Sequence, residues 1–550
     1  MSMKIALAQL NYIIGDFEQN TNKMLQQLRT AKTAGVDLIV FAELSTCAYP
    51  PRDFLEFSHF IEKCHASVEK LALECTGIAA IVGLPTVNPK KEGKNLYNSA
   101  CVLQNGKITD TIHKALLPTY DIFDEYRYFE PNRNFHCVTI GSEKIALTIC
   151  EDLWNIDDDP LYTSCPMDEL IQENPSIIIN IAASPFDYAH AAQRKSILQK
   201  NIHKYKLPLV YVNHVGAQTE LIFDGGSLAF NRSGHVITEA VSFEESLSLV
   251  EFTNGDLHVA KGTPSTPSIT NKYQSIHDAL ILGISDYFSK QQFKKAILGL
   301  SGGIDSAVVT YLAAKALGPQ NVKVLLMPSR YSSSGSIDDS VQLVNTLGVE
   351  SEIIPIEPVF DSFLSALSPA FEGLPANITE ENLQARTRGI LLMAQSNKFG
   401  SILLNTTNKS EMAVGYGTLY GDMCGGLSVI GDVYKTEVYE LVKYINREQE
   451  IIPTNIITKA PSAELRPDQK DSDSLPDYEI LDTLLYQYIE QRKGPDDLLA
   501  MGFDESLVRR VLKMVNTNEY KRHQTAPILR VSPKAFGSGR RMPIVAKYLS

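Results

Sequence analysis

The fold is decided by the stretch Leu298-Gly299-Leu300-Ser301-Gly302-Gly303-Ile304-Asp305-Ser306, which follows an apolar segment at 295–298. That segment predicts a short buried strand. Residues 306–317 have alanine, valine and leucine at helical spacing, and Gly318-Pro319 ends the predicted helix. A strand, a glycine turn and a helix direct backbone N–H groups and the positive end of a helix toward an anion. We therefore predict that residues 299–306 bind phosphate.

The glycine turn differs from two common nucleotide loops. No Gly-Lys-Ser/Thr follows it, as a Walker A loop requires, and it lacks the G-x-G-x-x-G spacing of dinucleotide-binding folds. Ser301 and Ser306 add hydroxyl donors to the turn. The pattern Ser-Gly-Gly-x-Asp-Ser resembles the pyrophosphate loop of the ATP-pyrophosphatases, and this resemblance implies cleavage of ATP to AMP and pyrophosphate.

Composition restricts the classes of partner. A chain of 550 residues is too long for one core, so we expect two to four domains. Its net charge of -13 argues against non-specific nucleic-acid binding. The sequence has no signal-peptide pattern and no apolar run of about 20 residues, the length that a membrane span needs. The eight cysteines lack metal-binding spacing, which favours a reducing compartment. We expect a cytoplasmic protein without nucleic-acid or membrane partners.

The best candidate for a linker is the small, polar, proline-bearing run at 262–268. We place one domain at 1–261, a linker at 262–270 and a second domain at 271–550. In the first domain, helices alternate with buried strands and two hairpins, which indicates an α/β sheet sandwich. In the second domain, repeated strand–helix units predict a doubly wound, mostly parallel sheet.

Three residues of the first domain lie at or just beyond predicted strand ends: Glu43, Lys114 and Cys150. Ligands gather at the carboxyl ends of parallel strands. Amide hydrolysis needs a nucleophile, a base and a cation for the oxyanion. Cys150 suits the first role, Glu43 the second and Lys114 the third. We also expect Lys114 to lower the pKa of the thiol from about 8.5.

The segments around these residues are similar to the signatures of the nitrilase superfamily, in the same order. The resemblance covers residues 1 to about 260 and implies an αββα sandwich with a Glu-Lys-Cys triad. The segment 123–129 resembles the glutaminase branch, which implies that Tyr120 and Ser184 hold glutamine. That branch usually has Lys or Arg six residues after the serine, where this chain has His190. The three signatures read Phe41-Ala42-Glu43-Leu44, His113-Lys114-Ala115-Leu116-Leu117-Pro118-Thr119-Tyr120 and Thr148-Ile149-Cys150-Glu151-Asp152-Leu153-Trp154.

In the second domain, the run 405–411 resembles the Thr-Thr-Gly-Asn-Lys-Ser-Glu motif of NAD synthetases, with Thr407 in place of glycine. Asp305 and Glu411 offer carboxylates for Mg²⁺, which prefers oxygen ligands and substrate phosphates. Residues 381–389 also resemble this family, and the charge-rich run 466–477 predicts a mobile loop. The resemblance implies Thr406, Lys435 and Ser462 as further ATP contacts, and Asn382, Glu411 and Lys521 as contacts to deamido-NAD.

Together the two halves resemble the bacterial glutamine-dependent NAD synthetases. That resemblance implies the substrates deamido-NAD, ATP and glutamine, with Mg²⁺, and the products NAD, glutamate, AMP and pyrophosphate. It also implies a homo-oligomer. We further expect ammonia to pass between the two sites without escaping to solvent.

The sequence leaves two alternative functions open. One is an amidotransferase of the same ATP-pyrophosphatase class with another acceptor, although 381–389 and 405–411 favour the dinucleotide. The other is a nucleotide-sensing module fused to an amidase, which would bind ATP without cleaving it. A pyrophosphate-release assay with deamido-NAD and glutamine separates these possibilities.

Overall fold

The computed structural model describes residues 2–157, 159–260, 271–467 and 469–549. The chain divides into two compact units, one ending at Thr270 and the next beginning at Asn271. The predicted linker 262–270 lies outside the described residues. Within the described ranges, no helix is both long and apolar enough to cross a membrane.

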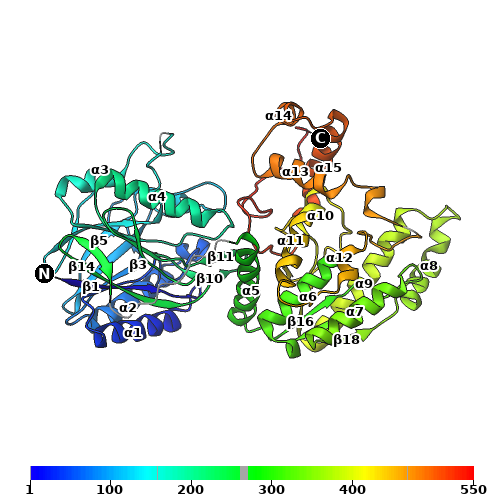
Figure 1. The fold of residues 1–550 in the computed structure, drawn as a ribbon, viewed down its shortest axis with the longest axis horizontal. Coiled ribbons are helices and arrows are strands. Elements are labelled where there is room, and N and C mark those ends of the chain that lie inside the picture. Colours follow the sequence, from blue (N-terminus) through cyan, green and yellow to red (C-terminus); the bar gives the residue numbers. More distant parts are fainter. Residues whose placement is uncertain (1, 158, 261–270, 468, 550) are drawn as a thin grey trace. The chain divides into compact units, whose positions relative to one another are not determined.

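The first unit is an αββα sandwich, as predicted, with helices outside two sheets (Figure 1). One sheet has the order β15-β14-β1-β2-β3-β4-β5 and the other β13-β12-β9-β8-β7-β6. The helices are α1 (Phe17–Thr33), α2 (Ser58–Glu74), α3 (Pro166–Leu170) and α4 (His190–Tyr205). The strands are β1 (Met3–Gln9), β2 (Leu38–Val40), β3 (Ala79–Val87), β4 (Leu96–Gln104), β5 (Lys107–His113), β6 (Val138–Ile140), β7 (Glu143–Ile149), β8 (Ile177–Ile181), β9 (Leu209–Val212), β12 (Leu228–Phe230), β13 (Val236–Glu239), β14 (Ser246–Thr253) and β15 (Asp256–Val259), with β10 (Val215–Gln218) and β11 (Leu221–Asp224) as a separate pair.

Each predicted catalytic residue lies just beyond a strand of this unit; β2 and most of β7 are buried, whereas β5 is mostly exposed or half-buried. β7, β8 and β9 pair in parallel, and all five residues of β8 are buried, because isoleucines point to both faces of a covered strand. Cys150 comes directly after β7 and Lys114 directly after β5, while Glu43 lies three residues beyond β2. One continuous apolar core includes residues of both sheets and holds these strand ends in place.

The second unit is built on the sheet β18-β17-β16-β19-β20, in which every pairing is parallel. This confirms the prediction of a parallel α/β domain. Helices α6 and α9 contact the central strands. The strands are β16 (Lys295–Gly299), β17 (Val322–Leu326), β18 (Glu350–Ile353), β19 (Ser401–Asn405) and β20 (Leu427–Ser428). The helices are α5 (Lys272–Lys290), α6 (Ile304–Leu317), α7 (Ser334–Leu347), α8 (Glu357–Phe371), α9 (Ile378–Phe399), α10 (Lys409–Val414), α11 (Lys435–Ile445) and α12 (Thr454–Thr458).

In this unit, α10 lies beside helices of the C-terminal region (Figure 1). Their buried side chains form one apolar cluster with those of α10. The cluster contains residues of α13 (Tyr478–Ile489), α14 (Pro495–Ala500) and α15 (Glu505–Thr517), and the short helix α16 (Glu519–Arg522) follows α15. Buried leucines and valines of α13 and α15 form much of the cluster. The cluster positions α10, and therefore the end of the run 405–411, next to the strand end of β19.

Candidate active sites

Glu43 and Lys114 form a completely buried ion pair in the first unit. The Lys114 Nζ lies 2.8 Å from Glu43 Oε1, and both side chains are at most 1% exposed. The Asn98 amide donates a hydrogen bond of 2.6 Å to the same oxygen, and the Ala183 N–H donates one of 2.9 Å to Oε2. The Glu43 carboxylate is therefore held in one orientation by donors from three segments of the chain.

Cys150 sits on a turn that is tied to the segment after Lys114. Its φ of 45° lies in the left-handed region, and it begins the 3₁₀ turn Cys150–Leu153. The Asp152 carboxylate accepts hydrogen bonds of 2.9 Å from the N–H groups of Ala115 and Leu116, and one of 3.0 Å from Ile149 N–H. Asp152 thus brings the strand ends that carry the cysteine and the lysine together.

The electrostatic environment of the thiol differs from the prediction. Burial, and next the Glu43 carboxylate, raise the pKa of Cys150 well above its usual range, while Lys114 acts in the opposite direction. Lys114 by itself lowers the thiol pKa, as expected, but the net effect is opposite to the expectation because burial and the Glu43 carboxylate outweigh it. The thiol is protonated at neutral pH, so a base must take its proton during the reaction.

Glu125 is a further member of this cluster that the sequence analysis did not single out. Its Oε1 lies 2.8 Å from Lys114 Nζ and accepts a hydrogen bond of 3.0 Å from the Tyr49 hydroxyl. Burial raises its pKa to about 7, with Lys114 lowering it and Glu43 raising it. Its Oε2 is buried without a hydrogen-bond partner among the described residues. The only signal in the sequence was its place within the segment 123–129.

The predicted glutamine contacts fall into two groups. The Ser184 hydroxyl lies 2.8 Å from His190 Nε2, and the His190 ring stacks on Trp154 with centroids 5.0 Å apart. The Tyr120 hydroxyl instead donates a hydrogen bond of 2.9 Å to Glu151, the residue next to Cys150. Ser184 and His190 are therefore in contact, while Tyr120 is connected to the cysteine turn through Glu151.

The phosphate loop of the second unit lines a cavity of about 300 Å³. Gly302 has a φ of 78°, and a Cβ there would lie only 2.5 Å from the backbone oxygen of Ser336, so the loop needs glycine at this position. The hydroxyls of Ser301 and Ser306 lie 3.1 Å apart. The cavity is lined by every residue of 299–306 and also by Thr406, Glu411, Lys435 and Ser462.

Two carboxylates meet a lysine in this cavity. Lys435 Nζ forms an ion pair with Asp305, whose other oxygen accepts a hydrogen bond of 3.1 Å from Asn408. Burial, and next the charge of Asp305, raise the pKa of Glu411 well above its usual range, although Lys435 acts in the opposite direction. No group of three or more metal-ligating His, Cys, Asp or Glu side chains occurs within the described residues. Two carboxylates near a phosphate loop nevertheless suit Mg²⁺, which usually takes one or two protein carboxylates and completes its shell with phosphate and water.

Asn382 and Lys521 do not line this cavity, unlike the other predicted residues of the second unit. The Thr418 hydroxyl donates a hydrogen bond of 2.9 Å to Asn382, and Lys521 Nζ donates hydrogen bonds of 2.8 Å to the carbonyls of Gly415 and Gly417. Both residues therefore hold the loop that follows α10. That loop leads to residues 421 and 422, which do line the cavity.

Each of the two units matches a family of known proteins. Residues 4–261 match the family described as carbon-nitrogen hydrolase, and residues 276–525 match NAD synthase. The glutamine-dependent NAD(+) synthetases of Synechocystis and Thermotoga maritima are 44% and 41% identical, and in both cases 99% of each chain is covered. A glutamine-dependent NAD+ synthetase structure from Acinetobacter baumannii, in complex with ADP, is 38% identical with a TM-score of 0.78 and covers 99% of both chains. The chain belongs to the family of glutamine-dependent NAD(+) synthetases.

Proposed function

We propose that residues 1–261 hydrolyse glutamine and that residues 271–550 use the released nitrogen to convert deamido-NAD to NAD. Glu43 takes the proton of the Cys150 thiol as the sulfur attacks the side-chain amide of glutamine. Lys114 lies beside Glu43 and stabilises the oxyanion that forms. The proton passes to the leaving nitrogen, so ammonia departs and a thioester remains. Water, activated by Glu43, then releases glutamate and restores the thiol.

The raised pKa of Cys150 supports this order of events. A thiol that stays protonated in the resting enzyme does not react until a bound amide is in place beside the base. Lys114 keeps its charge, because the carboxylates of Glu125 and Glu43 outweigh the effect of burial and raise its pKa well above its usual range. It can therefore stabilise the oxyanion at every physiological pH.

In the second unit, the carboxylate of deamido-NAD attacks the α-phosphate of ATP. Pyrophosphate leaves and an acyl adenylate forms; ammonia then attacks the acyl carbon and AMP departs. A carboxylate needs this activation because its oxygen is otherwise a poor leaving group. The N–H groups and hydroxyls of 299–306 stabilise the negative charge that builds on pyrophosphate. Thr406, Lys435 and Ser462 line the same cavity and supply further contacts to ATP.

Asp305 and Glu411 are the residues that would hold Mg²⁺ with the ATP phosphates. The ion would neutralise negative charge on the phosphates. The mutual repulsion of the two carboxylates fits a site that a cation completes. Chelation of Mg²⁺ should stop AMP formation and leave glutamine hydrolysis intact.

The remaining substrate contacts are assigned from the family resemblance and from the positions described above. Tyr120, Ser184 and His190 would hold glutamine, with the His190 imidazole where relatives of the glutaminase branch usually carry a cation. Asn382 and Lys521 would orient deamido-NAD together with Glu411, acting through the loop after α10. The proposal includes a cytoplasmic location and assembly into a homo-oligomer.

The observation that carries the proposal is the buried Glu43–Lys114 pair beside Cys150, because it accounts for glutamine as the nitrogen source. The test measures NAD, AMP and pyrophosphate from deamido-NAD, ATP and Mg²⁺, with glutamine and with ammonium in turn. Equal amounts of the three products are expected with either source, and glutamate is expected with glutamine. Nucleotide binding without AMP formation would support the sensing alternative instead.

A further inference from the structure

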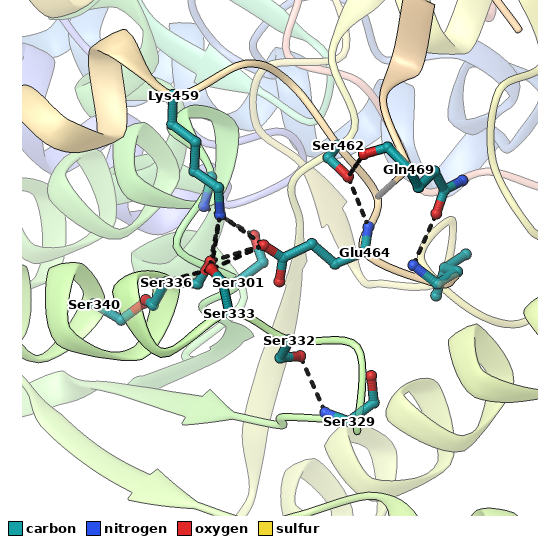
Figure 2. A network of polar contacts seen from close by, with 12 residues as sticks. Ser301, Ser329, Ser332, Ser333, Ser336, Ser340, Lys459, Ser462, Glu464 and Gln469 are labelled. Atoms are coloured by element: carbon teal, nitrogen blue, oxygen red, sulfur yellow. Dashed lines mark hydrogen bonds and ion pairs between the residues drawn. The ribbon is translucent and has the colours of Figure 1, made fainter. Parts of the chain in front are cut away.

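A lysine, two serines and a glutamate form a compact polar cluster in the second unit (Figure 2). Lys459 Nζ lies 2.6 Å from Glu464 Oε1 and also donates a hydrogen bond to the Ser336 hydroxyl. The hydroxyls of Ser336 and Ser333 donate to the same Glu464 oxygen over 2.9 Å and 3.3 Å. A single carboxylate oxygen therefore accepts from one ammonium and two hydroxyl groups.

This cluster borders the phosphate loop. Ser336, Lys459 and Glu464 line the cavity that residues 299–306 line. Ser336 also lies directly against Gly302, because a Cβ on that glycine would be 2.5 Å from its backbone oxygen and 2.8 Å from its Cβ. Ser336 and Lys459 consequently lie beside the loop that holds the phosphates of ATP in the proposed function.

The Glu464 carboxylate accepts hydrogen bonds from these donors, and a phosphate oxygen could accept the same hydrogen bonds. Ammonium and hydroxyl donors around an oxyanion form the strong, charge-assisted hydrogen bonds that also bind phosphate. The Glu464 backbone has a φ of 48°, a left-handed conformation that a residue with a side chain rarely adopts. Its side chain is 18% exposed, so the carboxylate borders solvent. Glu464 thus combines a disfavoured backbone conformation with a carboxylate at the edge of solvent.

We propose that Lys459, Ser333 and Ser336 form an additional anion site for the terminal phosphates of ATP and for the departing pyrophosphate, and that the Glu464 carboxylate fills this site when no ligand is bound. This inference rests on the proposed function of the second unit. The incoming phosphates displace Glu464 from Lys459. Glu464 competes with pyrophosphate and so promotes its release at the end of the cycle.

The test measures binding of magnesium pyrophosphate to the full chain by calorimetry. Lys459→Met removes the cation and should weaken binding about tenfold or more, because a charge-assisted hydrogen bond is lost. Glu464→Gln keeps the shape of the side chain but removes its charge, and should tighten binding several-fold. AMP, which lacks the terminal phosphates, should bind equally to all variants. Inorganic phosphate should follow the trend of pyrophosphate more weakly.

Glu440→Gln is the matched control, because Glu440 forms a 2.6 Å pair with Lys443 at the exposed surface of α11. It should bind pyrophosphate like the wild type. If the cluster only stabilises the loop, Glu464→Gln and Lys459→Met should both weaken binding, and that result would overturn the proposal. Unchanged binding in both variants would overturn it as well.

Two readouts separate this proposal from the proposed function. Glutamine hydrolysis by the first unit should be unchanged in every variant, and circular dichroism checks that the chain is folded. If the wild type forms NAD and AMP but the two variants do not shift pyrophosphate binding in opposite directions, only the anion site is wrong. If the wild type forms no AMP from deamido-NAD, the proposed function is wrong, whatever the binding data show.

Discussion

The buried Cys150 side chain interacts with charges of opposite sign, and this environment determines how the residue can react. Glu43 opposes ionisation of the thiol and Lys114 favours it, while burial adds to the effect of Glu43. A thiol in this setting needs its base in the same step in which it attacks, in contrast to cysteines that are thiolates at rest. The Glu43 carboxylate has to be fixed for this purpose, and its three hydrogen-bond donors hold it in one orientation.

Cys150→Ala should abolish glutamine hydrolysis and preserve NAD formation from ammonium. Loss of a nucleophile lowers turnover by at least about 10³-fold. Glutamate release and ammonium-dependent NAD formation are the two measurements. Cys101→Ala is the control, since Cys101 is a buried free cysteine on β4 and should leave both activities intact. Loss of both activities in Cys150→Ala, with the chain folded, would contradict the separation into two sites.

His113, the residue before Lys114, should make the first unit sensitive to acid. Burial, and next the charge of His136, lower its pKa to about 4. The unfolded chain takes up this proton near pH 6.5, whereas the folded chain does not, so stability falls as the pH drops from 6.5 toward 4. This single group should cost about 1 kcal/mol of unfolding free energy between pH 7 and 5, after allowance for solvent screening.

The measurement uses Trp154, the single tryptophan of the chain, whose fluorescence follows urea unfolding of the first unit. His113→Asn can still accept the 2.7 Å hydrogen bond that links His113 to Ser99, but it cannot titrate. The variant should therefore lose that part of the pH dependence. His59→Asn, at an exposed position of α2, is the control. An unchanged pH dependence in His113→Asn would show that another group is responsible.

Single residues were predictable where the chemistry of a strand end is visible in the sequence. Glu43, Lys114 and Cys150 could be singled out because each carries a reactive group at or just beyond a predicted strand end. Glu125 could not, because it lies in a loop turn, and its role depends on burial next to Lys114. The cluster of Lys459 and Glu464 could not be predicted from the sequence either, because only the folded chain brings them to Ser336, more than 100 positions away.

At the scale of elements, β3 holds the Glu43 segment through a glycine. A Cβ on Gly83 would lie 2.3 Å from Leu44 N and 2.5 Å from Ala42 O. Gly83→Ala should therefore push the Glu43 segment out of place and reduce glutamine hydrolysis by about a hundredfold, the effect expected for a displacement of about 1 Å. NAD formation from ammonium should be retained. Full glutamine hydrolysis would mean that the sheet adjusts without moving Glu43.

Gly302→Ala is the matched counterpart in the second unit. The new methyl group would meet the backbone of Ser336 at 2.5 Å and would also force a side chain into the left-handed region. ATP binding and AMP formation should be lost while glutamine hydrolysis continues. Gly83→Ala should thus impair only glutamine hydrolysis, and Gly302→Ala only the ATP-dependent step. The activity that each variant retains shows that the chain is not generally misfolded.

Some elements with strong local signals were predicted, and several that also depend on distant partners were missed. The turn Asn105-Gly106 has positive φ at both residues, as its sequence requires, and connects β4 to β5. Strands β14 and β15 were not predicted, although Asn254-Gly255 joins them with the same positive φ at both residues. β14 also pairs with β1, a partner 237 to 249 positions away that the local sequence does not show. Helices α13 to α15 were also not predicted. Their apolar faces pack with α10 in one cluster, and this contact is visible only in the folded chain.

At the scale of the whole molecule, two reactions have to be coordinated on one chain. In the proposed reaction, the first unit makes ammonia, and the second unit consumes it at an acyl adenylate that water can also destroy. Ammonia in solution is mostly protonated at pH 7, and ammonium has no lone pair with which to attack. Nitrogen that leaves glutamine as neutral ammonia is therefore more useful than nitrogen taken from the solvent, provided that it reaches the adenylate before it gains a proton.

Nitrogen labelling tests whether this transfer is internal. The enzyme is given glutamine labelled with ¹⁵N in its side-chain amide, together with an excess of unlabelled ammonium, and the NAD formed is analysed by mass spectrometry. We expect the amide of NAD to carry mainly ¹⁵N, because ammonia passes to the adenylate without mixing with the solvent pool. Cys150→Ala should give only unlabelled NAD in the same mixture, which shows that the second unit can use the external pool. If the wild type incorporates external ammonium in proportion to its concentration, the two reactions communicate only through the solvent, and internal transfer is wrong.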